Sequence, residues 1–161
     1  MDFIKYFSLL ILSFFGLISG SVLAFFTKEE LDTGKKYFQI MQSGLFVIIL
    51  ILFVFSLNKS FLFSLMVFFI IFFGVLLIHS NFKFKKTSNL IYIIFSFIFY
   101  LSSKFQNLNL IASLIFIYGM PTGSLLTKEI LDKKKGPMSL INKLKYYLSY
   151  LIIALILYFL Q

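Results

Sequence analysis

Long runs of apolar residues, separated by short lysine-rich segments, most restrict what this chain can fold into. An α-helix needs roughly 20 apolar residues to cross the hydrocarbon core of a bilayer, and about 17–25 are tolerated. Six runs meet this requirement: Ile4–Phe26, Phe38–Leu57, Phe61–Ile78, Thr87–Ser103, Leu108–Leu126 and Leu144–Leu160. Because a backbone in lipid must satisfy its hydrogen bonds internally, each run is predicted to be a membrane-spanning helix.

Composition agrees with a chain embedded in lipid. Of its 161 residues 60% are hydrophobic and 13% are charged, and the mean hydropathy is +0.99. So few polar residues cannot cover the core of a soluble domain. We therefore expect one all-α domain over residues 1–161, a polytopic transmembrane helical bundle. The first run is longer than the ~7–15-residue apolar core of a signal peptide, so it is expected to be the first span.

The fourth run is the weakest, and it could instead be re-entrant, which would leave five spans. The lysines favour six. With six spans and the N-terminus outside, twelve of the fifteen lysines fall in inside loops and three fall outside, as the positive-inside rule expects. We therefore expect a multi-pass protein of the cell membrane, with the N- and C-termini outside and the lysine-rich loops in the cytoplasm.

Charge also narrows the function. No run has a carboxylate or a lysine in its interior, although charged groups at membrane depth usually mark ion or proton pathways. This argues against a proton pump, a voltage sensor or a carrier with a buried carboxylate. The net charge of +9 does not indicate nucleic-acid binding, because the lysines punctuate apolar runs instead of forming a basic patch. With no cysteine, thiolate metal sites and disulfides are excluded.

Two stretches of the sequence match each other. One contains Gly16-x-x-x-Gly20-Ser21 and then Thr27-Lys28-Glu29-Glu30-Leu31-Asp32, and the other contains Gly119-x-x-x-Gly123-Ser124 and then Thr127-Lys128-Glu129-Ile130-Leu131-Asp132. The match predicts a parallel internal repeat of helical hairpins, spans one–two over residues 4–57 and spans five–six over residues 108–160, about an axis along the membrane normal. The first and fifth helices would then touch, and the two acidic motifs would face each other.

The glycines in both copies favour close helix packing, because two glycines on one helix face let another backbone approach. The alternative is a transport pathway, since Gly- or Pro-interrupted segments at matching places in two halves point to a transporter's site. Pro121 interrupts the second copy and has no counterpart in the first. For either function the candidate residues are Gly16, Gly20, Ser21, Gly119, Pro121, Gly123 and Ser124.

The carboxylates form a second candidate site. Glu29 and Asp32 are three residues apart, as are Glu129 and Asp132, so each pair can share a helix face. Four carboxylates meeting across a twofold axis at the cytoplasmic surface could bind Mg²⁺ or Ca²⁺. The alternative, which leads us to assign no metal site, is that they are solvated loop charges paired with Lys28, Lys36, Lys128 and Lys135.

Other polar residues have local interpretations. Thr27 and Glu30 have the spacing of a capping box, which predicts a short surface helix that ends at Gly34. His79, the one histidine, is interpreted as an interfacial residue. Tyrosines near the ends of the runs predict an aromatic belt, made of Tyr92, Tyr100, Tyr146, Tyr147, Tyr150 and Tyr158.

Three classes of function remain. The first is a non-catalytic subunit, scaffold or assembly factor of a membrane complex, which fits the glycines and the uncharged spans. The second is a small transporter or channel, homo-oligomeric, with its site near the Gly/Pro break of the fifth span. The third, a membrane enzyme acting on lipids, lacks a convergent acid–base pair, so we assign no catalytic residue and no cofactor. Expected partners are the lipid bilayer and other membrane protein chains or further copies, and no nucleic acid.

Overall fold

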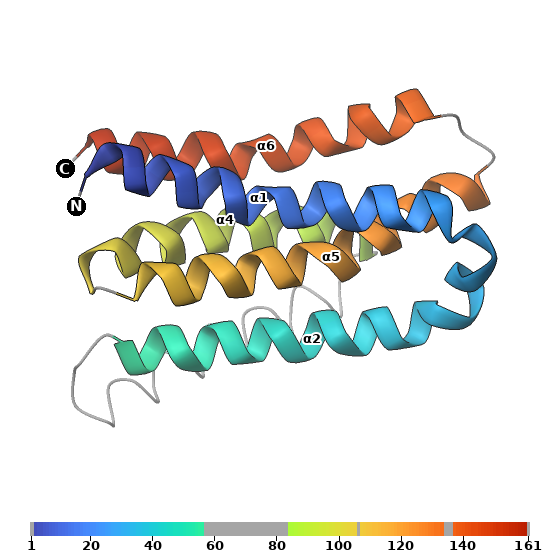
Figure 1. The fold of residues 1–161 in the computed structure, drawn as a ribbon, viewed down its shortest axis with the longest axis horizontal. Helices are drawn as coiled ribbons and strands as arrows, with labels where there is room; N and C mark the ends of the chain where they lie inside the picture. The colour runs from blue at the N-terminus through green and yellow to red at the C-terminus, as the bar shows by residue number, and fades with distance from the viewer. Residues whose placement is uncertain (1, 57–83, 106, 134–136, 161) are drawn as a thin grey trace.

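In a computed structural model, the described part of the chain is helical. The structure describes residues 2–56, 84–105, 107–133 and 137–160. These ranges hold α1 (Phe3–Phe26), the short 3-10 helix η1 (Lys28–Glu30), α2 (Leu31–Ser56), α4 (Phe84–Lys104), α5 (Leu108–Asp132) and α6 (Pro137–Phe159). The α-helices lie side by side along the long axis of the molecule, and both chain ends lie at the same end of it (Figure 1). The prediction of an all-α helical bundle is confirmed.

Four of the described helices are long and apolar enough to cross a membrane: α1, α2, α5 and the Met138–Phe159 part of α6. The apolar part of α4, Asn89–Lys104, is shorter, in keeping with the weakness of the fourth run. The third predicted span, Phe61–Ile78, lies outside the described residues, as does His79. Apolar helices of this length indicate a membrane-embedded protein.

Two helices begin about two turns before the apolar runs do. The run beginning at Phe38 is preceded in α2 by a polar start at Leu31, and α6 begins at Pro137 instead of Leu144. The lysines in these extra turns are good helix formers. Proline at the first position of α6 costs no hydrogen bond, because its missing N–H would have no partner in the helix. The helices therefore extend beyond the hydrocarbon core.

The capping box predicted at Thr27 does not form. The Thr27 hydroxyl donates backwards to the carbonyl of Leu23 at 3.2 Å, as does its backbone N–H at 3.0 Å. Thr27 thus ends α1 and caps no following helix with its side chain. The prediction that a short helix ends at Gly34 is also wrong, because α2 continues through this residue. A helix interior tolerates one glycine at a cost of about 1 kcal/mol.

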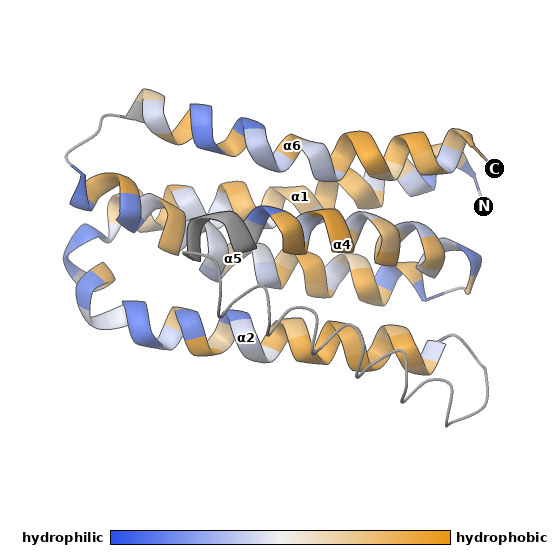
Figure 2. Ribbon diagram, turned by 180° about the vertical axis from the view of Figure 1, so that it is seen from behind, coloured by the Kyte–Doolittle hydropathy of each residue, from blue (hydrophilic) through white to orange (hydrophobic). Residues whose placement is uncertain are grey.

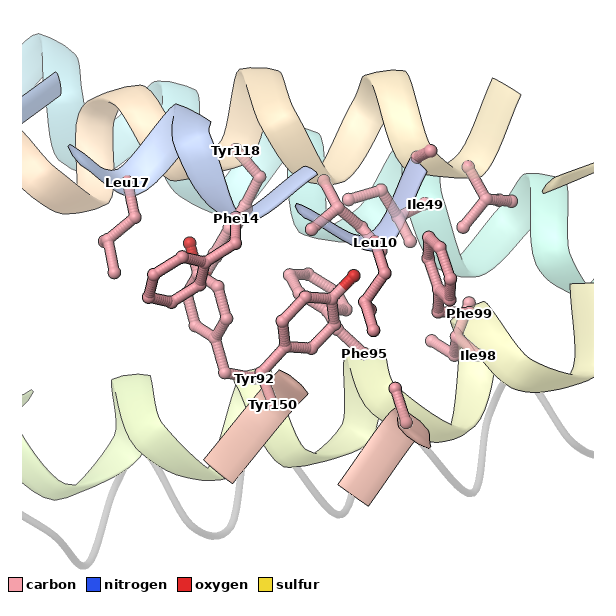
Figure 3. Close-up of a cluster of buried hydrophobic side chains, with 14 of the residues drawn as sticks. Leu10, Phe14, Leu17, Ile49, Tyr92, Phe95, Ile98, Phe99, Tyr118 and Tyr150 are labelled. Atoms are coloured by element: carbon pink, nitrogen blue, oxygen red, sulfur yellow. The ribbon is translucent and has the colours of Figure 1, made fainter. Parts of the chain in front are cut away.

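The bundle is built around two helix pairs. Helix α1 packs mainly on α5, α4 packs mainly on α6, and α2 lies against α5 on its other side. Large aliphatic and aromatic side chains from all five helices fill the core. Figure 3 shows Tyr92, Phe95 and Tyr150 among Leu10 and Phe14 of α1. The rings pack edge to face, with centroids 4.8 Å apart for Phe95 and Tyr118, an arrangement that aromatic pairs favour.

The first and last helices are also joined. The Tyr6 hydroxyl of α1 donates to the carbonyl of Ala154 in α6 at 2.9 Å, and both residues are fully buried. The rings of Tyr6 and Tyr158 lie 4.6 Å apart, and Phe3 contacts Tyr158 at 5.5 Å. This contact lies near the end of the bundle that carries both termini (Figure 1).

Polar residues collect at the opposite end (Figure 2). There η1, the first turns of α2 and α6 and the last turn of α5 bring together seven described lysines, which are Lys28, Lys35, Lys36, Lys128, Lys133, Lys143 and Lys145. We call this the lysine-rich end.

Candidate functional site

Four glycines lie where α1 and α5 meet. A Cβ atom placed on Gly16 would come within 1.9 Å of the carbonyl oxygen of Phe116, and one on Gly20 within 2.1 Å of that of Met120. Seen from α5, a Cβ on Gly119 would lie 2.5 Å from the backbone nitrogen of Leu17. Each of these atoms belongs to the backbone and cannot rotate away, so α1 and α5 are in backbone contact that glycine alone permits.

Two serines tie the same helices together. The Ser21 hydroxyl lies 3.3 Å from the carbonyl oxygen of Gly123, and the Ser124 hydroxyl lies 3.2 Å from that of Gly20. Each hydroxyl thus donates to the carbonyl of the glycine that directly precedes the other serine. Each hydroxyl proton is shared with a carbonyl of its own helix, that of Leu17 for Ser21 and that of Met120 for Ser124. Paired contacts of this kind follow from two similar sequences packed side by side and pointing the same way.

Pro121 is buried in the middle of α5, beside a polar cluster. Having no N–H, it leaves the carbonyl four residues earlier without its helical donor. On the next residue, the Thr122 hydroxyl donates to the carbonyl of Tyr118 at 2.9 Å. The Gln42 amide nitrogen of α2 donates to the Thr122 hydroxyl at 2.9 Å and to the Tyr118 hydroxyl at 3.2 Å. These bonds join α2 to α5 in the core.

Tyrosines continue this cluster toward α4 and α6. The hydroxyls of Ser13 and Tyr150 lie 2.7 Å apart, and Ser96 donates to the carbonyl of Tyr150 at 3.1 Å. The hydroxyl of Tyr92 is buried and has no hydrogen-bond partner among the described residues. Its ring lies 5.0 Å from that of Tyr147 and 5.8 Å from that of Tyr150. A buried hydroxyl without a partner is unfavourable by about 1–3 kcal/mol.

The aromatic-belt prediction is therefore wrong for three tyrosines. Tyr92, Tyr147 and Tyr150 are buried, whereas Tyr146 is 68% exposed. Position along a run predicts depth in the membrane, whereas burial depends on the face of the helix: Tyr92, Tyr147 and Tyr150 face the other helices, and Tyr146 faces outward. Gln42 was also missed, although it is an amide only four residues inside the second apolar run. An uncharged polar residue at that depth is a usable signal for an interhelical hydrogen bond.

The four predicted acidic residues do not form one cluster. Asp32 pairs with Lys128 at 2.5 Å, and Glu129 pairs with Lys133 and Lys143, each at 2.7 Å. The other two, Glu29 and Asp132, are exposed and form no ion pair with a described lysine. Among the described residues, no three carboxylate or histidine side chains lie close enough to bind a metal ion.

Lys128 joins the two matching motifs. Its side chain is only 9% exposed, and its ammonium donates to the carbonyl of Leu31 at 3.2 Å as well as to Asp32. The lysine of the second motif thus holds the start of α2, next to the aspartate of the first. The sequence had placed Lys128 in a loop, but α5 runs on to Asp132 and carries it along.

No protein-family model matches this sequence, and no curated protein or solved structure is detectably similar to it. The interface between α1 and α5 therefore has to be interpreted from its own chemistry. Its four glycines have no side-chain functional group, and the Ser21 and Ser124 hydroxyls both donate to backbone carbonyls. What this interface can do is hold two helices at backbone contact.

Proposed function

We propose that the protein is a non-catalytic integral membrane protein that acts as a subunit, scaffold or assembly factor of a membrane complex. The observation that carries this proposal is the backbone contact of α1 and α5. A substrate cannot pass between helices so close that a single methyl group would lie 2.1 Å from a carbonyl oxygen. The Gly/Pro segment is engaged in packing within the chain, which leaves the outer faces for partners.

The outer faces of α2 and α6 fit such a role. Ile48 and Ile51 of α2 and Ile152 and Ile156 of α6 are exposed among the described residues. Of the four long apolar helices, α6 is the least buried. In a membrane these faces contact lipid or another chain, and close-packed transmembrane helices can associate through van der Waals contact. The glycine faces, by contrast, are already occupied.

We further propose six spans, with both termini outside, the lysine-rich end in the cytoplasm, and an internal repeat that relates the hairpins at residues 4–57 and 108–160. Three observations support this. The termini lie at one end of the bundle and the lysines at the other (Figure 1). Helix α2 stops at the end opposite to the one where α4 begins, so one further crossing would connect them. The bonds of Ser21 and Ser124 are reciprocal.

Photo-crosslinking in the native membrane tests the scaffold proposal. A photoreactive amino acid at exposed Ile152 or Ile48 should form stoichiometric crosslinks to one or a few specific membrane proteins. The same group at Ile115, which is fully buried, serves as the matched control and should crosslink within the chain. Gentle extraction should recover the same partners at constant ratio. A protein that is recovered alone, with crosslinks from Ile152 and Ile48 to lipid, would refute the proposal.

One observation favours a second function, a small homo-oligomeric transporter or channel. The Tyr92 hydroxyl has no hydrogen-bond partner among the described residues, and the bonded Gln42, Tyr118 and Thr122 side chains lie beside Pro121 in the core. A polar substrate on its way through would exchange hydrogen bonds with such groups. Flux of small polar solutes into vesicles that contain the pure protein tests this, with Gln42→Leu as the variant. Flux in the wild type that Gln42→Leu abolishes would favour transport over the scaffold.

A further inference from the structure

Not all lysines at the lysine-rich end are engaged by carboxylates. Asp32 is paired with Lys128, and Glu129 with two other lysines. In contrast, Lys35 and Lys36 of α2 and Lys145 of α6 are exposed and form no ion pair with a described carboxylate. Lys28 is also exposed without such an ion pair, but its ammonium lies over the ring of Phe25, 4.7 Å from the centroid. Lys35, Lys36 and Lys145 thus remain for a partner outside the chain.

The depth of these lysines indicates where that partner lies. Helix α2 has 26 residues, which span about 39 Å at 1.5 Å per residue, whereas the hydrocarbon core is about 30 Å thick. The apolar run from Phe38 onward fills that core, so the turns before it lie at the level of the lipid headgroups. Lys35 and Lys36 are in these turns. Lys145 lies at the second residue of the apolar run of α6, at the same boundary.

Exposed apolar side chains flank the same lysines. On α2, Tyr37 directly follows Lys36 and is 75% exposed, and Ile40, one helical turn after Lys36, is 66% exposed. On α6, Tyr146 follows Lys145 and is 68% exposed. Tyrosine at the membrane boundary holds its ring toward the acyl chains and its hydroxyl in water. A lysine next to it extends its ammonium to the phosphate level.

We propose that Lys35 and Lys36 of α2 form a binding surface for anionic phospholipid headgroups, with Tyr37 in contact with the upper part of the acyl chains. Lys145 and Tyr146 of α6 form a second surface of the same kind on the opposite side of the bundle (Figure 1). Charge complementarity favours this occupant, since these cations have no ion pair with a described carboxylate. Nucleic acid is disfavoured, because the lysines lie along the sides of membrane helices and alternate with exposed apolar groups, where a phosphodiester chain would have to displace lipid. Anionic lipid headgroups match these lysines both in their negative charge and in their position at the membrane surface.

The expected effect is large enough to measure. A lysine near an anionic surface contributes about 1 kcal/mol of attraction, which corresponds to about fivefold in lipid affinity. Removal of two such charges should therefore lower the preference for anionic over zwitterionic lipid by fivefold or more. The preference should also weaken with added salt, because the charges are exposed and are screened beyond about 10 Å at 0.1 M salt.

The experiment compares two double variants of the full chain, K35Q/K36Q and K5Q/K104Q. Both remove two charges, but Lys5 and Lys104 lie at the end with the termini. Each protein is reconstituted in nanodiscs that contain equal amounts of phosphatidylglycerol and phosphatidylcholine. Lipids that stay bound after a mild detergent wash are then counted by native mass spectrometry.

Wild type and K5Q/K104Q should retain phosphatidylglycerol in excess, and K35Q/K36Q should lose most of that excess while unfolding at the wild-type temperature. Adding K145Q should lower it further, by the share of the second surface on α6. An equal loss in both double variants would overturn the proposal, because charge alone, without position, would then account for binding. A wild type without preference would overturn it too, as would an acidic protein that occupies these lysines in the native membrane in place of lipid.

Discussion

A single methyl group at Gly20 is expected to force α1 and α5 apart. A Cβ there would lie 2.1 Å from the carbonyl oxygen of Met120. To reach an ordinary contact distance of 3.4 Å, the two helices must move apart by about 1.3 Å. The hydrogen bond from Ser21 to Gly123 is 3.3 Å long, and that from Ser124 to Gly20 is 3.2 Å. Neither survives such a displacement, because both are already near the outer limit for a hydrogen bond.

The free energy of unfolding should fall by about 1–3 kcal/mol. Overpacking typically costs 1–3 kcal/mol, and each lost hydrogen bond between membrane helices costs about 0.6 kcal/mol on average. Alanine is the better helix former by up to about 1 kcal/mol, which offsets the two lost bonds. The overpacking cost therefore decides the result.

The matched control is Gly44→Ala on α2. Gly44 is exposed, and no described atom beyond its own stretch of helix lies within 4 Å of a Cβ placed there. Its substitution should leave the stability unchanged or raise it slightly through helix propensity. Titration of each variant with a denaturing detergent, followed by circular dichroism, gives both free energies. If Gly20→Ala unfolds at the same point as Gly44→Ala, α1 and α5 are not in backbone contact.

Three further changes probe the other contacts. Ser21→Ala with Ser124→Ala should lower the stability by about 1 kcal/mol in the same titration, because two bonds of about 0.6 kcal/mol are lost without overpacking; no change would mean that neither bond is formed. Lys128→Met should release the start of α2, and trypsin should then cleave faster after Lys28. The free energy of unfolding should fall by less than about 1 kcal/mol, as for other ion pairs with an exposed partner. Cleavage at the wild-type rate would contradict the contact. Gln42→Leu should lower the free energy of unfolding by about 1 kcal/mol, because two hydrogen bonds to α5 are lost. The comparison variant is Gln42→Glu, which keeps the shape of the side chain but places a charge in the core and should lower the free energy of unfolding further.

Apolar length was sufficient to predict the described α-helices, and the match of the two glycine-containing stretches predicted the contact of α1 with α5. A pair of glycines on one helix face predicts that the backbone of another helix approaches closely. When one chain has two such pairs on parallel helices, the two glycine faces can pack against each other. The spacing could not predict the depth of contact or the bonds of Ser21 and Ser124, because these depend on the relative register of α1 and α5. The sequence match suggests that register, but hydropathy alone does not.

The errors share one cause, which is that hydropathy locates the hydrocarbon core and not the ends of a helix. Helix α5 continues to Asp132, past the predicted end at Leu126, and so carries Lys128 onto the start of α2. Helix α6 begins at Pro137, seven residues before the predicted start, and Tyr150 is on the face of this helix that packs in the core. Carboxylates assigned to one loop cluster are separated for the same reason, because they lie on different helices and each has lysines nearby.

The partnership of α1 with α5 also sets an order of events during synthesis. Helix α1 enters the membrane before α5, which ends more than 100 residues later in the sequence. At about 5–20 residues per second, the glycine face of α1 waits on the order of 5–20 s for its partner. During this interval Ser21 can bond only to its own helix or to another protein, such as an insertion factor. A nascent chain that ends before Leu108 lacks α5, so the glycine face of its first helix stays without the partner that it has in the folded bundle.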